Sequence, residues 1–127
     1  MSTPEHLTPL AVEQKLRHLV TELTRAQAAL AQARDLEVDA KHEHDRARRR
    51  ALLSEKSPKV TRGGYTTAER DAWVDEQVTD LRFKYDRAVV TRESAQDHLR
   101  VLRDQAEIVR SLGASVRQAY EMAGVTS

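Results

Sequence analysis

The 127-residue chain contains no cysteine, which excludes a disulfide framework, a thiolate metal site and a cysteine nucleophile. Aromatic residues make up 4% of it and charged residues 32%, so we do not expect a thick globular core. No apolar run approaches the roughly 20 residues that cross a bilayer, and no basic segment followed by an apolar run opens the chain. We therefore expect a soluble cytoplasmic protein with no membrane partner.

Proline and glycine are also scarce, and their absence leaves room for a long first helix. Thr8-Pro9 has the form of a helix start, with Thr8 as N-cap and Pro9 at the first helical position. Neither residue type occurs again before about Leu53. Apolar residues recur there at steps of four and three, the spacing of a coiled-coil seam. We predict a helix over about 9–53 whose seam has Glu37 and His44 as polar members and the following apolar members: Val12, Leu16, Leu19, Leu23, Ala26, Leu30, Ala33, Ala40, Ala47 and Ala51.

A second seam runs from Val74 to Tyr120 with the same alternation of steps. Thr66-x-x-Glu69 has the form of a capping box, and Ala123-Gly124 ends the pattern. We predict one unbroken helix over about 67–122. The turn before it, over about 54–66, contains the turn signals Ser57-Pro58 and Gly63-Gly64.

Two long helices with one short connection predict an all-α fold in which they pack as an antiparallel coiled-coil hairpin, a single domain over 1–127. If the numbers of facing residues add up to about 125, each seam residue of one helix faces a seam residue of the other, and the turn centres between Arg62 and Gly63. Tyr85 then lies across from Ala40. Glu37 and Arg92 lie about one turn apart across the seam, and we predict a salt bridge that fixes the register.

A further set of apolar residues on the second helix lies off this seam. A few exposed apolar residues are normal in any protein. A stripe of them also suits packing against a second hairpin, as in a four-helix bundle. We favour the second interpretation and predict a homodimer with the following interface: Phe83, Val90, Val101, Ile108 and Leu112.

No pattern in the sequence indicates catalysis, a metal or a cofactor. His42 and His44 are two residues apart, so on a helix they point away from each other and do not form a metal pair. Nucleophile-elbow and phosphate-loop spacings are missing. The carboxylates alternate with arginines at helical spacing, as on a solvated face. We predict that the protein is not an enzyme.

Basic residues concentrate between Lys41 and Arg62, opposed only by Glu43, Asp45 and Glu55. The hairpin would gather them at its turn, beside Tyr65 and Trp73, and aromatic side chains there can stack on bases. The alternative is that helices simply carry many charges and that Trp73 caps the seam. We name residues 46–70 the basic tip and predict these nucleic-acid-binding residues in it: Arg46, Arg48, Arg49, Arg50, Lys56, Lys59, Arg62, Tyr65 and Arg70.

Three features resemble small coiled-coil proteins encoded in the replication and recombination gene modules of phages of Gram-positive bacteria. They are the Ala/Arg/Glu-rich first helix, Thr67-Ala68-Glu69-Arg70 after the turn, and residues 109–117, VRSLGASVR. The resemblance implies a phage-encoded accessory to DNA transactions inside the host cell and supplies no catalytic residues. The secreted WXG hairpin proteins fit less well, because Trp73 is followed by Val74-Asp75 and not by x-Gly.

Two functions follow as expectations. The first is a non-enzymatic accessory protein in DNA recombination or replication, whose partners are a second copy and single-stranded DNA or a recombination or replication protein. The alternative is a protein-binding scaffold or chaperone-like adaptor with no nucleic-acid role.

Overall fold

The structure is a computed structural model that describes residues 7–125, and these residues are almost entirely helical. The helices are α1 (Pro9–Leu52), α2 (Thr67–Gln77) and α3 (Thr79–Val125). Over residues 7–125 there is no β-strand, and an isolated bridge joins Val60 to Tyr65. The predicted all-α class is confirmed.

Tertiary contacts divide the chain into two compact units. The first unit comprises Met1–Leu30 and Ala95–Ser127, and the second comprises Ala31–Ser94. Helices α1 and α3 each contribute one part to each unit, and α2 belongs to the second. Whether the chain is one domain, as predicted, stays a prediction.

The two predicted helix starts are confirmed by their capping bonds. Thr8 Oγ1 accepts a hydrogen bond from the Ala11 amide at 3.1 Å, ahead of Pro9. Thr66 Oγ1 accepts from the Glu69 amide at 3.1 Å, and the Glu69 carboxylate accepts from the Thr66 amide at 3.2 Å. These bonds satisfy amides that the first helical turn leaves without intrahelical partners.

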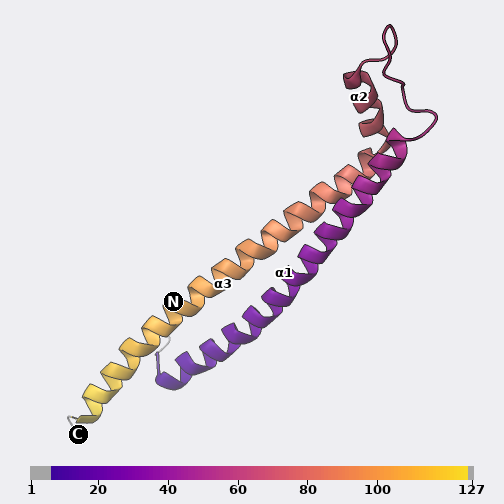
Figure 1. The fold of residues 1–127 in the computed structure, drawn as a ribbon. Helices are drawn as coiled ribbons and strands as arrows, with labels where there is room; N and C mark the ends of the chain where they lie inside the picture. The colour runs from indigo at the N-terminus through magenta and orange to yellow at the C-terminus, as the bar shows by residue number, and fades with distance from the viewer. Residues whose placement is uncertain (1–6, 126–127) are drawn as a thin grey trace, which may run out of the picture. The chain divides into compact units, whose positions relative to one another are not determined.

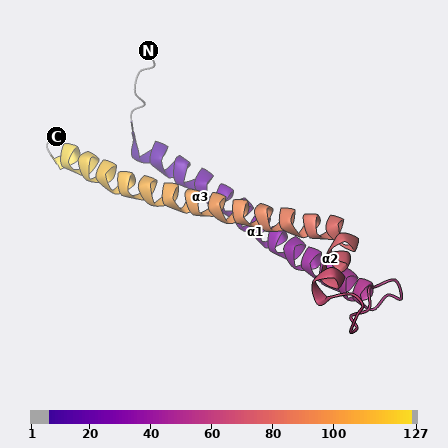
Figure 2. The same cartoon turned by 90° about the horizontal axis from the view of Figure 1, so that it is seen from above.

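In the first unit, α1 and α3 run in opposite directions and bury a Leu- and Ala-rich seam (Figures 1 and 2). The core of this unit consists of eight buried residues: Val12, Leu19, Ala26, Leu30, Leu99, Leu102, Ala106 and Val109. At the predicted seam position Tyr120 the side chain is 52% exposed. In the register where Val12 meets Gly113, the position across from Tyr120 precedes Pro9, the first residue of α1, so α1 does not pack against Tyr120.

Gly113 sets the closest approach of α1 and α3 in the first unit. A Cβ atom at this position would lie 2.8 Å from Val12 Cγ1, closer than real Cβ atoms come to a neighbour. The missing side chain therefore lets the helices approach, at the cost of helix propensity. The numbers of this pair add up to 125, the predicted register.

The second unit is held by ion pairs across α1 and the α2–α3 segment. Glu37 binds Arg92, Glu43 binds Lys84 at 2.9 Å, and Arg48 binds Asp75 at 3.4 Å. The residue numbers rise on α1 as they fall on its partners, so the packing is antiparallel. The predicted salt bridge between Glu37 and Arg92 is confirmed. Buried apolar residues of this unit are Ala33, Ala40, Val74 and Val78.

The prediction of one unbroken helix from about residue 67 is wrong, because the chain leaves helical geometry at Val78. Val78 has φ −114° and ψ 17°, and its amide bonds the Asp75 carbonyl at 3.2 Å. Thr79 Oγ1 donates to the carbonyls of Asp75 and Glu76 at 3.1 Å each. The Thr79 hydroxyl competes with backbone donors for these two carbonyls. Figure 1 shows α2 leaving α3 at an angle.

Candidate nucleic-acid interface

The basic tip lies in the second unit, where residues 53–66 connect α1 to α2. The Gly64 amide bonds the Thr61 carbonyl at 2.9 Å, which closes a four-residue turn. Gly63, in its third position, has φ +83°, the value that a type II turn requires and that favours glycine. A side chain on Gly64 would collide with the Thr61 hydroxyl. This geometry leaves Arg62 exposed in the turn.

Most cations of the basic tip are exposed, and their charged groups make no ion pair or hydrogen bond within residues 7–125. They are Arg46, Arg49, Arg50, Lys56, Lys59 and Arg62. The structure thus leaves their charges open to an external anion.

Two of the predicted binding residues are already engaged. The Arg48 guanidinium pairs with Asp75 at 3.4 Å, and the half-buried Arg70 pairs with Asp71 at 3.5 Å. Each ion pair must be loosened before the arginine can contact a phosphate. The sequence did not distinguish Arg48 from the other cations, since Asp75 meets it only after the chain folds back, whereas the pairing of Arg70 with the adjacent Asp71 was overlooked.

A wide, shallow hollow of about 790 Å³ lies beside these cations. Lys56 and Lys59 line it together with the aromatic rings of Tyr65 and Trp73. Tyr65 is 53% exposed and Trp73 is half-buried. Trp73 was not among the predicted binding residues, because a role as a cap on the seam was the preferred interpretation of it. The combination of two rings and two lysines in one hollow suits a planar base with an attached phosphate.

Two carboxylates, Glu55 and Glu69, also line the hollow. Glu69 is held by the capping bond from the Thr66 amide. It stabilises the start of α2 and so contributes to the placement of Trp73 one helical turn later. Glu55 is exposed, and both carboxylates oppose the binding of an anion in the hollow.

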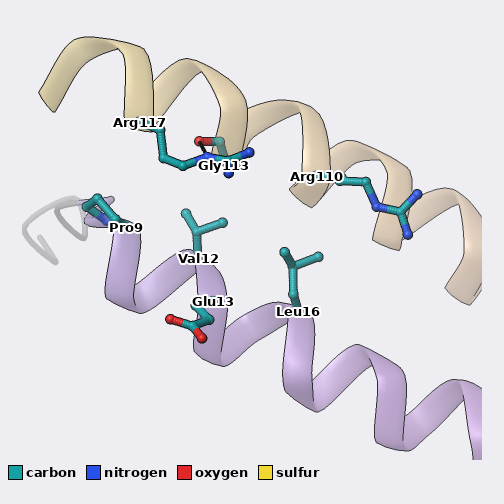
Figure 3. Close-up of a pocket in the computed structure, with 7 residues that line it drawn as sticks. All are labelled: Pro9, Val12, Glu13, Leu16, Arg110, Gly113 and Arg117. Carbon is teal, nitrogen blue, oxygen red and sulfur yellow. Dashed lines mark hydrogen bonds between the residues drawn. The ribbon is translucent and has the colours of Figure 1, made fainter. Parts of the chain in front are cut away.

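A second hollow, of about 250 Å³, lies in the first unit beside the start of α1 (Figure 3). Pro9, Val12 and Leu16 face it from α1. Arg117 Nε donates to the Gly113 carbonyl at 3.4 Å, and Arg110 pairs with Glu107 at 2.7 Å. Because these arginines are engaged along their own helix, the hollow has an apolar floor without converging polar groups. It reflects the close helix packing at Gly113.

Histidine and carboxylate side chains form no metal-binding group of three or more within the described part of the chain. His44 is buried in the second unit, with Nδ1 3.2 Å from Asp45 Oδ1.

The five residues predicted to form a dimer interface are all exposed. Phe83 and Val90 belong to the second unit, and Val101, Ile108 and Leu112 to the first. The Arg87 guanidinium lies 5.8 Å from the Phe83 ring centre.

Comparison of the chain with family models, curated proteins and solved structures finds no match. Among the helices of residues 7–125, none combines the length and apolarity needed to span a bilayer.

Proposed function

We propose that the chain is a non-enzymatic accessory protein that binds nucleic acid through its basic tip. The observation that carries this proposal is a set of exposed cations whose charged groups have no ion-pair partner within residues 7–125: Arg46, Arg49, Arg50, Lys56, Lys59 and Arg62. They lie next to a hollow lined by Tyr65 and Trp73. Each cation that neutralises a phosphate releases a condensed counterion, which favours binding at low salt. The rings add stacking on bases that a duplex does not expose.

This combination favours single strands and little sequence preference. Lysine and arginine on phosphates carry no sequence information, and every base has a face on which an aromatic ring can stack. Neighbouring arginines on α1 are turned by about 100° from one another, so one strand contacts only some of them. We expect three or four contacts and weak, micromolar affinity.

The biological setting is a proposal that rests on the sequence resemblance alone. In it, the chain supports phage DNA recombination or replication in the host cytoplasm. We further propose that two copies associate through the exposed apolar stripe of α3 into a four-helix bundle. The exposure of Val101, Ile108 and Leu112 supports this association.

Fluorescence anisotropy with labelled single-stranded and double-stranded oligonucleotides tests the binding proposal. Arg49→Glu with Arg50→Glu should abolish binding at low salt and leave the helical circular dichroism signal intact. The matched control is Arg34→Glu with Arg103→Glu, which changes net charge equally at exposed arginines outside the basic tip. Equal loss in both variants would mean that net charge, and not the tip, governs binding. No binding of any oligonucleotide by the unaltered protein would refute the proposal.

A protein-binding scaffold or chaperone-like adaptor is the second candidate function. The observation that favours it is the apolar surface, since exposed apolar stripes mark interaction sites. The two candidates separate in one experiment. Strong salt dependence of oligonucleotide binding supports the first, whereas co-purification of one protein partner without an oligonucleotide shift supports the second.

A further inference from the structure

One face of α3 in the first unit carries a second heptad pattern that the fold leaves uncovered. Its members from Val101 to Ala119 each directly precede a residue of the predicted seam, so the face is turned by about 100° from that seam. Val101 is 50% exposed, Ile108 60%, Leu112 44% and Met122 65%. We call the following set the α3 face: Val101, Gln105, Ile108, Leu112, Ser115, Ala119 and Met122.

Two hollows on this face have the form of coiled-coil holes. One, of about 350 Å³, is lined by Glu107 and by the diamond of Ile108, Ser111, Leu112 and Ser115. The other, of about 280 Å³, is lined on α3 by Gln105, Ile108, Val109 and Leu112, and on α1 by Lys15 and Leu19. In each hollow, four α3 residues stand at positions i, i+3, i+4 and i+7. A diamond of four such residues is what receives a knob from a facing helix in coiled-coil packing.

We propose that the α3 face binds the same face of a second copy, antiparallel, with a two-fold axis beside Leu112. This inference rests on the proposed self-association and adds the partner's direction and register. Leu112 of each copy fills the Ile108–Ser111–Leu112–Ser115 hole of the other. An isologous contact of this kind closes at two copies.

In this register the numbers of facing residues add up to about 224, and large side chains meet small ones. Val101 lies across from Met122, and Gln105 across from Ala119. Ile108 lies across from Ser115. Within the α3 face, Leu112 is then the residue that faces the same residue of the other copy. A parallel pair would instead stack Ile108 on itself and Ser115 on itself, with alternating crowded and empty layers. Close interdigitation therefore favours the antiparallel arrangement.

Side chains at the edge of the α3 face are compatible with the same register. Asp104 lies across from Gln118, whose amide can donate to the carboxylate, and Ser111 lies across from itself. No like charges meet at these positions. A shift by one heptad that lowers the sum to about 217 would bring the polar His98 across from Ala119. The register centred on Leu112 thus matches charge as well as shape.

Single-cysteine variants test the register cleanly, because the chain has no cysteine of its own. Under mild oxidation Leu112→Cys should form a disulfide-linked dimer, since its two copies lie at the axis within bonding reach. Ile108→Cys and Ser115→Cys should each remain largely uncrosslinked alone and should crosslink when mixed. Val20→Cys, 61% exposed on α1, is the control for random collision. Leu112→Asp should convert the dimer to monomer in analytical ultracentrifugation.

Three outcomes would overturn the inference, and they fall on different claims. A monomeric unaltered protein refutes the proposed self-association as a whole. A dimer in which Ile108→Cys and Val101→Cys crosslink to themselves as readily as Leu112→Cys is parallel, which refutes only the direction. If Leu112→Asp remains dimeric and no α3-face cysteine crosslinks, the dimer uses another surface. Oligonucleotide binding is measured separately and is not at issue in any of the three.

Discussion

Arg92 holds Glu37 with two hydrogen bonds across the second unit, Nε to Oε2 at 2.9 Å and Nη2 to Oε1 at 3.3 Å. The two side chains are only 24% and 20% exposed, unlike the other ion pairs between α1 and the α2–α3 segment. The hydrogen bond from Arg92 lowers the pKa of Glu37 against the opposing effect of desolvation, and the charge of Lys41 assists. The pKa of Arg92 is raised in turn by its bond to Glu37. The pair links two helices at one register, as polar seam residues do in coiled coils.

Glu37→Gln should lower the melting temperature at neutral pH, because it removes the charge that Arg92 contacts. The folded pKa of Glu37 lies below its ordinary value of 4.5, so its stabilising contribution is complete above that value. It is lost as the pH falls through the lowered folded pKa. The melting temperatures of Glu37→Gln and the unaltered protein should therefore converge in strong acid. Circular dichroism melts across the acid range measure this.

The matched control is Asp86→Asn, whose pair with Arg82 is 57% and 62% exposed. Exposed pairs contribute about 0–1 kcal/mol, so this variant should melt close to the unaltered protein at every pH. A gap for Glu37→Gln that persists unchanged in strong acid would show that packing, and not charge, accounts for the effect.

Gly113→Ala should destabilise the first unit even though alanine favours helix. Alanine gains about 1 kcal/mol of propensity over glycine in a helix interior. Its Cβ would lie 2.8 Å from Val12 Cγ1, and valine in a helix has one preferred rotamer and cannot turn away. Overpacking of this kind costs about 1–3 kcal/mol. Adding Val12→Ala should recover part of the loss, as measured by a double-mutant cycle in urea. Gly124→Ala, with nothing within 4 Å of its Cβ, is the control.

Val74→Ala tests the packing of α2 in the second unit. Val74 is fully buried, at 0% exposure, directly after Trp73. Full burial of a valine side chain contributes about 1.5–3 kcal/mol, and its truncation also leaves a cavity. We expect a loss of that order in urea unfolding. Val38→Ala, at a side chain 66% exposed on α1, should change stability by less than about 0.5 kcal/mol. Equal effects would mean that α2 does not depend on this contact.

The heptad pattern predicted the helices, the antiparallel packing and the Glu37–Arg92 pair, because these follow from which residues share a helix face. The break at Val78 was missed because a seam position reports burial and not backbone conformation. Val78 is buried, as a seam residue should be, although its dihedrals are not helical. The β-branched pair Val78-Thr79 is not a sufficient signal, since Val89-Val90-Thr91 stays helical within α3. In the basic tip, the distinction between Arg48 and its free neighbours depends on Asp75, which only the folded chain brings near.

Trp73 is the sole tryptophan of the chain and gives the binding proposal an internal reporter. It is half-buried in the hollow with Tyr65, so a base that enters should stack there and quench its fluorescence. Titration with oligo(dT) should show quenching, and the logarithm of the binding constant should fall with the logarithm of salt concentration by about 0.7 for each phosphate contact on single strands.

Tyr65→Ala should weaken binding by about 1–3 kcal/mol, the contribution of one stacked base. Arg48→Gln should have a small effect, because Asp75 already holds that arginine. Duplex DNA of equal charge should quench little. Quenching by duplex as strong as by oligo(dT) would contradict base stacking in the hollow and leave phosphate contact alone as the mode of binding.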